Sequence, residues 1–176
     1  MSMKAVFLDR DGTMILDPPD LRVDNLSDLH LFPDTVKALK LLAGLDFGVI
    51  EVTNQAGIGE GRIDWAEFEH INKMFMDLIE SSGINFLKIY VCPHKPEDNC
   101  ACRKPKPYMI LQAAKEFDID LAESYTIGDR ESDIMAGVNA GTKTILVKTG
   151  NRPVISPEAT YTAVDLLEAV EYIAAH

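Results

Sequence analysis

The stretch KAVFLDRDGT, residues 4–13, decides the fold prediction for this 176-residue chain. Its apolar run at residues 4–8 is typical of a buried β-strand. The run ends at Asp9 and Asp11, and Gly12 then lets the backbone turn sharply. Two carboxylates at the end of a buried strand can act together on one centre. The alternative is an ordinary surface turn, which Asp-Gly commonly makes.

The rest of the chain alternates strand-like runs with longer amphipathic runs. Further strands are predicted at residues 47–52, 86–91, 125–127 and 144–147, with a weaker one near 160–163. Helices are predicted at residues 34–42, 65–82, 108–117, 131–140 and 166–175. Such alternation implies right-handed crossovers and a mostly parallel sheet that helices cover on both faces. We therefore expect one α/β domain spanning residues 1–176.

Composition excludes several classes of function. The formal net charge of −11 opposes binding to nucleic acid or to an anionic membrane. The N-terminal apolar run is too short for a signal peptide, and no run approaches the ~18 residues of a membrane span. The three cysteines lie close together, which fits a local role in a reducing compartment. We expect a cytoplasmic protein with a small-molecule partner, and the sequence does not predict its oligomeric state.

Polar residues come directly after four of the predicted strands. They are Asp9, Thr53, Cys92 and Asp129. Because ligands bind at the carboxyl ends of parallel strands, we expect these residues to meet along one edge of the sheet. Asp133 lies four residues after Asp129, on the same side of a helix start. Since carboxylates suit Mg²⁺, Asp9, Asp11 and Asp129 predict a magnesium site, with Asp133 in support.

Donors and cations for an anionic substrate are also present. Thr53, Asn54 and Gln55 offer a hydroxyl and two amides after the second strand, and Arg103 and Lys104 precede a helix that Pro105 begins. In isolation, a loop cap at Thr53 and a solvated cation pair would explain them. Beside the acid clusters they predict a pocket for a small phosphorylated substrate. Two arginines of the acidic motifs, Arg10 and Arg130, are further candidates for substrate binding.

The third strand leads into a loop with four metal-ligand side chains. They are Cys92, His94, Cys100 and Cys102. A Cys₃His set is typical of a closed, tetrahedral, structural zinc site. A Cys-His nucleophilic pair would leave two cysteines unexplained, and a disulfide would leave an odd thiol. A zinc-bound loop would hold Arg103 and Lys104 against the phosphate.

These motifs resemble those of the haloacid dehalogenase (HAD) superfamily, in the usual order and over nearly the whole chain. They are Asp9-x-Asp11-Gly12-Thr13, Thr53, Lys104, and Gly128-Asp129 with Asp133. The resemblance implies a three-layer, Rossmann-like fold and phosphatase activity. The segment between residues 13 and 47 is too short for a cap domain, so we expect an open site.

The resemblance also implies residue roles. Asp9 would be the nucleophile that forms an aspartyl phosphate, and Asp11 the general acid and later the base. Mg²⁺ would be held by Asp9, the backbone carbonyl of Asp11 and Asp129, while Thr53 and Lys104 would bind phosphoryl oxygens. We expect Asp11 to be protonated for the first step, because partial burial and the charge of Asp9 favour the acid form.

The zinc loop resembles one branch of the superfamily, which contains histidinol-phosphate phosphatase and heptose 1,7-bisphosphate 7-phosphatase. The short loop at 92–102 and the segment 128–130 favour the histidinol enzymes, whereas a free-standing chain and the segment 141–159 favour the heptose enzymes.

Chemistry leaves both substrates open at this stage. Acids that could bind a histidinol amine are Asp17, Asp20 and Glu60, and cations that could bind a second phosphate are Arg22, Arg62 and Lys106. We expect histidinol phosphate as the substrate, with heptose bisphosphate as the alternative. A non-catalytic phosphosugar-binding module is more remote, because binding alone does not need the Asp9 and Asp11 pair.

Overall fold

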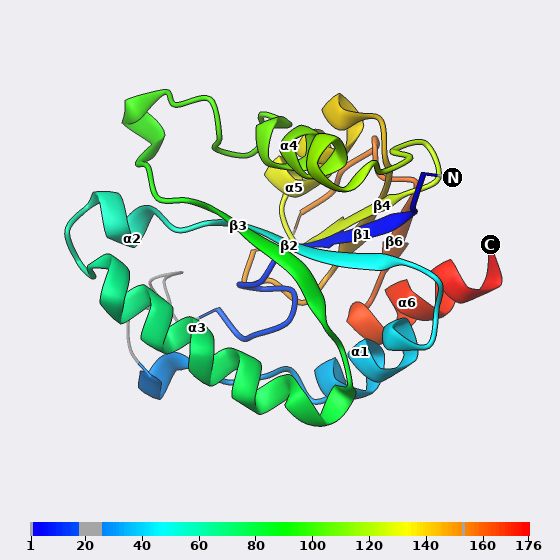
Figure 1. The fold of residues 1–176 in the computed structure, drawn as a ribbon, viewed down its shortest axis with the longest axis horizontal. Helices are drawn as coiled ribbons and strands as arrows, with labels where there is room; N and C mark the ends of the chain where they lie inside the picture. The colour runs from blue at the N-terminus through cyan, green and yellow to red at the C-terminus, as the bar shows by residue number, and fades with distance from the viewer. Residues whose placement is uncertain (1, 18–25, 153) are drawn as a thin grey trace.

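The computed structural model describes residues 2–17, 26–152 and 154–176. In this part of the chain, six strands form one parallel sheet in the order β3-β2-β1-β4-β5-β6 (Figure 1). The strands are β1 (Ala5–Leu8), β2 (Gly48–Asn54), β3 (Phe86–Cys92), β4 (Tyr125–Gly128), β5 (Lys143–Val147) and β6 (Tyr161–Ala163). The predicted parallel sheet is confirmed, and its weakest predicted strand forms one edge as β6.

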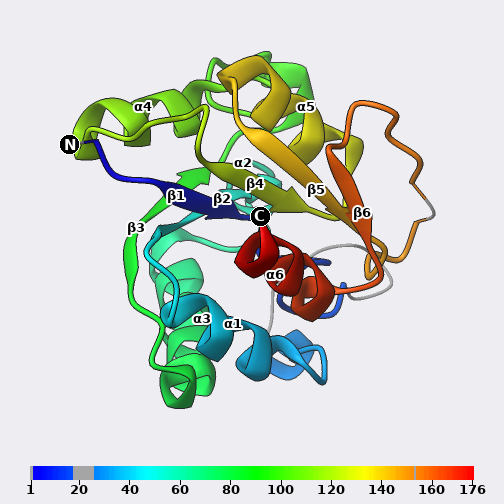
Figure 2. The same ribbon diagram turned by 90° about the vertical axis from the view of Figure 1, so that its right-hand side faces the viewer.

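Helices cover both faces of this sheet, which gives three layers. Figure 2 shows α4 (Tyr108–Phe117) and α5 (Glu131–Ala140) over one face, and α1 (Thr35–Ala43), α3 (Trp65–Ile79) and α6 (Leu166–Ala175) over the other. A short helix, α2 (Ala56–Gly59), follows β2, where sequence analysis predicts a loop. Single 3₁₀ turns lie at Leu26–Asp28, Glu80–Ser82 and Pro96–Asp98. None of the described helices is long and apolar enough to cross a membrane.

Strand β1 is buried on both faces because it lies in the middle of the sheet. Val6 and Leu8 pack into the core formed with α1, α3 and α6, and Ala5 and Phe7 pack into the core formed with α4 and α5. All four side chains are fully buried. This explains the continuous apolar run before Asp9, since a central parallel strand has no solvent face.

Helix α3 begins and ends at local sequence signals. Asp64 accepts a hydrogen bond from the Glu67 amide (2.9 Å), and the Glu67 carboxylate accepts one from the Asp64 amide (2.7 Å), which completes a capping box. Gly83, in the left-handed conformation (φ 72°), follows the 3₁₀ turn Glu80–Ser82 that continues the helix. The helix places Phe68 beneath the turn that follows β1.

The parallel register aligns the ends of the central strands. Leu8 lies opposite Glu51 of β2 and Ile127 of β4, and Asn54 lies opposite Cys92 of β3. The polar residues that follow these strands therefore gather along one edge of the sheet, as predicted.

Candidate active site

A cleft of about 140 Å³ lies at this edge of the sheet. Its lining includes every residue for which a catalytic role is expected, namely Asp9, Asp11, Thr53, Arg103 and Lys104. The remaining lining residues are Asn54, Gln55, Ala56, Gly57, Arg130, Ser132 and Asp133. Residues from four motifs far apart in the sequence thus share one small space.

Lys104 occupies the centre of the site. Its Nζ lies 2.6 Å from Asp9 Oδ1 and 2.7 Å from Asp133 Oδ1, and it donates to the carbonyl of Val52 at 2.7 Å. Burial lowers the pKa of Lys104, but Asp133 and Asp9 outweigh that effect and raise the pKa above its usual value. The side chain is therefore a buried ammonium ion held between two carboxylates.

Asn54 fixes the backbone of Lys104. Its Oδ1 accepts from the Lys104 amide at 3.1 Å, and its Nδ2 donates to the Lys104 carbonyl at 3.3 Å. Sequence analysis places Asn54 among the substrate-binding residues. In the structure both ends of its amide serve to position the cationic loop.

Thr53 also has a partner in the site. The Thr53 side chain is buried, and its Oγ1 accepts a hydrogen bond from Gln55 Nε2 at 2.8 Å. Because a hydroxyl carries one donor and rotates to suit its surroundings, its proton can still reach an oxygen in the cleft. This geometry agrees with the expected contact to a phosphoryl group.

Three carboxylates crowd together next to Lys104. One oxygen from each of Asp9, Asp129 and Asp133 lies within 4.8 Å of the others. Burial raises the pKa of Asp9 to about 7, with Asp133 and Asp11 adding to the effect and Lys104 opposing it. Burial, then Asp9 and Asp133, raise the pKa of Asp129 to about 8, against the opposing effect of Arg130.

The surroundings of Asp129 fit a divalent cation. Its Oδ1 is buried and has no hydrogen-bond partner among the residues that the structure describes. A Cβ atom at Gly12 would lie 2.5 Å from Asp129 Oδ2, and one at Gly150 would lie 2.1 Å from it, so both positions need glycine. Asp129 Oδ1, unpaired within the described part of the chain and crowded by two further carboxylates, is the kind of oxygen ligand that Mg²⁺ prefers.

Asp133 supports this centre through Lys104. Its Oδ1 contacts Lys104, and its Oδ2 accepts from the backbone amide of Arg130 at 3.0 Å, at the start of α5. Both oxygens are thus engaged, which agrees with the expected supporting role.

Asp11 differs from expectation in its protonation state. Its Oδ1 accepts from Arg10 Nε at 2.7 Å, and its Oδ2 accepts from Gln55 Nε2 at 2.9 Å. Burial alone would raise the pKa of Asp11, but the charge and hydrogen bond of Arg10, together with Gln55, hold the pKa below its usual value. The substrate-free site therefore favours ionised Asp11.

Arg10, which the sequence predicts to bind substrate, is not among the described residues that line the cleft. Its side chain is fully buried, and its guanidinium carbon lies 5.5 Å from the centre of the Phe68 ring, on the α3 side of the sheet. Glu51 is fully buried as well and attracts the Arg10 charge. Arg10 is therefore buried on the core side of Asp11, which its Nε contacts, while Asp9 and Asp11 line the cleft.

Arg103 and Arg130 supply the cations at the cleft rim. Arg103 Nη1 donates to the His94 carbonyl at 3.2 Å. Arg130 Nη2 lies 3.2 Å from Asp17 Oδ2, and its Nε lies 3.6 Å from Asp129 Oδ2. Asp17, a candidate for binding an amine, is therefore already paired with a cation.

The other specificity candidates lie elsewhere. Lys106 Nζ donates to Asn99 and to the Cys100 carbonyl (2.7 Å), so it braces the zinc loop. Arg62 lines a separate hollow beside Trp65, and Glu60 is exposed at the end of α2. Asp20 and Arg22 lie outside the described residues.

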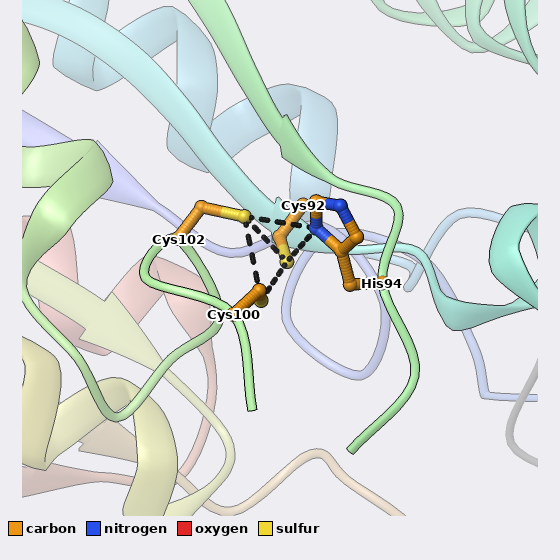
Figure 3. A group of neighbouring side chains, drawn as sticks. All are labelled: Cys92, His94, Cys100 and Cys102. Atoms are coloured by element: carbon orange, nitrogen blue, oxygen red, sulfur yellow. Dashed lines mark hydrogen bonds between the residues drawn. The ribbon is translucent and has the colours of Figure 1, made fainter. Parts of the chain in front are cut away.

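The four predicted zinc ligands converge on one point (Figure 3). Cys102 Sγ lies 2.9 Å from Cys92 Sγ, 3.6 Å from Cys100 Sγ and 3.3 Å from His94 Nδ1. Three sulfurs and one imidazole nitrogen within this space suit a tetrahedral Zn²⁺ ion, and they leave no protein ligand position open. The donor set therefore fits the structural zinc site that the sequence predicts.

Backbone hydrogen bonds join this loop to α2, a contact that sequence reasoning missed. The Gln55 amide donates to the Cys92 carbonyl (2.7 Å), and the Gly59 amide donates to the Pro93 carbonyl (2.9 Å). A Cβ at Gly59 would lie 2.5 Å from the Pro93 oxygen. The glycines that follow Thr53-Asn54-Gln55 were the sequence feature that could have predicted this close approach.

Sequence reasoning also missed the segment after β5. Thr149 Oγ1 donates to the Gly12 carbonyl at 2.6 Å, and Asn151 Nδ2 donates to the Asp17 carbonyl at 2.7 Å. With Gly150 against Asp129, this segment closes one side of the acidic site. The rule that ligands bind beyond strand ends, applied to the fifth strand, would have found it.

Fold and site together define a class of α/β phosphatase, and the comparisons agree. A HAD-hydrolase-like family model matches residues 101–169. The D-glycero-beta-D-manno-heptose-1,7-bisphosphate 7-phosphatase of Helicobacter pylori strain J99 is 40% identical over 171 residues, covering 97% of each chain. The protein belongs to the HAD-like phosphatase family, which confirms the predicted class and activity.

Further relatives place it in the predicted branch. The bifunctional histidine biosynthesis protein HisB of Campylobacter jejuni (strain 81116) is 40% identical over 144 residues, which are 81% of this chain but 41% of that protein. The crystal structure of D,D-heptose 1,7-bisphosphate phosphatase from B. bronchiseptica, complexed with magnesium and phosphate, has a TM-score of 0.90 and 31% identity. It covers 98% of this chain, and this chain covers 99% of it.

Proposed function

We propose that this protein is a magnesium-dependent phosphatase that removes the 7-phosphate of D-glycero-β-D-manno-heptose 1,7-bisphosphate. The observation that carries the proposal is the cleft, where the Asp9 carboxylate contacts the Lys104 ammonium and belongs to the acidic cluster with Asp129 and Asp133, while Asp11 lines the same cleft. The relatives that match over nearly their whole length support this choice of substrate. This reverses the preference for histidinol phosphate reached from the sequence.

The first step is transfer of the phosphoryl group to Asp9. A carboxylate oxygen of Asp9 attacks phosphorus while the bond to the ester oxygen breaks, and that oxygen takes the proton of Asp11. Lys104 offsets the negative charge of the phosphoryl oxygens, and the Thr53 hydroxyl donates to one of them. Asp9, Asp129 and the Asp11 carbonyl would hold Mg²⁺, which supplies further charge neutralisation when bound.

The second step is hydrolysis of the aspartyl phosphate. Ionised Asp11 accepts a proton from water, the water oxygen attacks phosphorus, and the bond to Asp9 breaks. Inorganic phosphate leaves, and Asp9 is a carboxylate again. The contacts with Arg10 and Gln55 that lower the pKa of Asp11 keep it ionised, as the base role requires. For the first step, an entering phosphate dianion opposes the effect of Arg10 and raises the pKa of Asp11, which favours its acid form.

Charges at the rim of the cleft support a bisphosphate. Arg103 and Arg130 line the cleft outside the catalytic carboxylates, where a second anionic group could bind them. Asp17 is a candidate for binding an amine, but its carboxylate contacts Arg130. A cationic histidinol amine would therefore meet a rim with two arginines.

Histidinol phosphate remains the second candidate, because HisB proteins match this chain at 39–40% identity. The test compares kcat/KM for heptose β-1,7-bisphosphate and for histidinol phosphate, with Mg²⁺ present. We expect the heptose substrate to be preferred by at least about 10²-fold, a ratio that unpaired polar groups can produce. A preference for histidinol phosphate would overturn the substrate assignment but not the phosphatase class.

A matched variant tests the chemistry. Asp9→Asn keeps the size of the side chain and removes the nucleophile, so turnover of both substrates should vanish while the circular dichroism spectrum stays unchanged. A near-native rate in this variant would rule out the aspartyl phosphate route.

A further inference from the structure

Asp11 is held at both carboxylate oxygens by side chains from two directions. From the core side, Arg10 Nε donates to Oδ1 at 2.7 Å, with Arg10 Nη2 at 3.4 Å from Oδ2. From the start of α2, Gln55 Nε2 donates to Oδ2 at 2.9 Å. Because the donors act on different oxygens, they fix the rotation of the carboxylate as well as its position.

Each of the two holding residues is itself fixed. Gln55 Nε2 also donates to Thr53 Oγ1 at 2.8 Å, and the Gln55 amide is tied to the Cys92 carbonyl at 2.7 Å. Gln55 is buried, with 6% of its surface exposed. Arg10 has no exposed surface and packs over the ring of Phe68. Neither side chain can follow Asp11 if that carboxylate turns away.

We propose that Gln55 and Arg10 are positioning residues that aim Asp11 at the oxygen of the leaving group. The inference rests on the proposed function, in which Asp11 protonates that oxygen. A general acid is effective only within hydrogen-bond reach of the atom it protonates, and small errors of orientation are costly. In this proposal Arg10 and Gln55 contact Asp11, whereas the sequence predicts that they contact the substrate directly.

The positioning role can be tested by comparing substrates whose leaving groups differ in basicity. When the leaving group is an alkoxide, which is strongly basic, bond cleavage depends on protonation by Asp11. When it is p-nitrophenolate, which is weakly basic, cleavage needs little help from an acid. A misdirected Asp11 should therefore slow hydrolysis of an alkyl phosphate much more than hydrolysis of p-nitrophenyl phosphate.

The experiment measures kcat/KM for heptose β-1,7-bisphosphate and for p-nitrophenyl phosphate in Gln55→Leu and Gln55→Met. Both variants remove the donor to Asp11 without adding a charge, and Gln55→Met keeps the length of the side chain. We expect kcat/KM for the alkyl substrate to fall by at least about tenfold, part of the 10²–10⁴ that general acid catalysis contributes. The value for the aryl substrate should change little, and thermal melting should confirm that both variants are folded.

Two further variants distinguish an error in the positioning role from an error in the acid role of Asp11. Asn54→Ala lies in the same cleft but contacts Lys104 and not the carboxylate, so it should slow both substrates equally. Asp11→Asn should show the selective loss in its strongest form. Equal effects on both substrates in the Gln55 variants, beside a selective loss in Asp11→Asn, would overturn the positioning role alone. Equal effects in Asp11→Asn itself would overturn the acid role of Asp11 and the positioning role with it.

Discussion

Lys104 shows how one residue can connect fold stability to chemistry. It is 5% exposed, and its ammonium group lies between Asp9 and Asp133. A buried charge persists only with close partners, and here the partners are the expected nucleophile and Asp133 in the first turn of α5. The same contacts that keep Lys104 charged also keep it ready for a phosphoryl oxygen.

Replacing this lysine should cost stability as well as activity. Lys104→Met leaves two buried carboxylates without their cation, so the free energy of unfolding should fall by about 3–5 kcal/mol near neutral pH. The matched control is Lys73→Met, because Lys73 contacts Asp77 at the same 2.7 Å on the surface of α3. Its loss should be no more than about 0.5 kcal/mol. Urea unfolding measures both, and equal losses would contradict the importance of burial.

Glu51 predicts a pH effect on stability. Burial raises the pKa of Glu51 to about 7, against the opposing charge of Arg10. The folded state therefore binds more protons than the unfolded chain between about pH 4.5 and pH 7, and Glu51 makes the protein less stable as the pH rises through this window.

The variant Glu51→Gln does not titrate at this position. Relative to the wild type, its free energy of unfolding should rise by up to about 3 kcal/mol from the acid to the neutral end of the window, since one pKa unit corresponds to about 1.4 kcal/mol. Unfolding curves at the two ends provide the measurement. A constant difference between the two proteins would show that Glu51 does not titrate in this range.

For single residues, the sequence predicts which of them lie at the site better than it predicts where their side chains point. Asp9, Asp11, Thr53 and Asp129 could be placed because each follows a strand of a parallel sheet. Arg10 could not, because an arginine beside two aspartates is usually solvated, and only the backbone of the turn places it over the Phe68 ring.

The zinc loop and α2 form one unit at the level of secondary structure. Helix α2 has the sequence AGIG, whose two glycines disfavour a helix, and the sequence therefore predicts a loop. The helix exists because the amides of Gln55 and Gly59 pair with the loop carbonyls of Cys92 and Pro93. A local prediction lacks such partners, since they lie at the end of β3 and directly after it, far along the chain from α2.

Loss of the metal ligands should therefore disturb more than the loop. Cys102→Ser should reduce bound zinc, which elemental analysis measures, and should increase hydrogen exchange of the Gln55 and Gly59 amides. The matched control is Glu97→Ala, at an exposed position of the same loop, which should keep its zinc and its protection. Protected amides in a zinc-free Cys102→Ser protein would contradict the coupling.

The segment after β5 offers a second test of an element. Gly150→Ala would place a methyl group against Asp129 Oδ2, where the available distance is 2.1 Å, so Asp129 must move. We expect a higher Mg²⁺ concentration for half-maximal activity, whereas Gly44→Ala, at a helix end with φ −84°, should not change it. Unchanged magnesium dependence in Gly150→Ala would contradict the placement of Asp129 in the metal site.

For the whole molecule, alternating strand and helix patterns were sufficient to predict the parallel sheet and its functional edge. They were not sufficient to choose the substrate. The expectation of histidinol phosphate rested on local segments such as residues 92–102 and 128–130, and Asp17 was one acid that could bind its amine. The structure pairs Asp17 with Arg130, 113 residues away. A local sequence pattern does not reveal this contact. It pairs the Asp17 carboxylate, a candidate for binding an amine, with an arginine at the rim of the cleft.

The central position of β1 has a consequence for how the enzyme is made. β1 pairs with β2 on one side and with β4 on the other, and the Ala5 amide donates to Ser124 Oγ, 119 residues away. A chain emerging from the ribosome can therefore pair only one edge of β1 until β4 has been synthesised. Until then the other edge is an apolar strand with unpaired amides, which is a binding site for chaperones. Asp9 and Asp129 meet only afterwards, so the nascent chain cannot assemble a working phosphatase before most of its sequence has been translated.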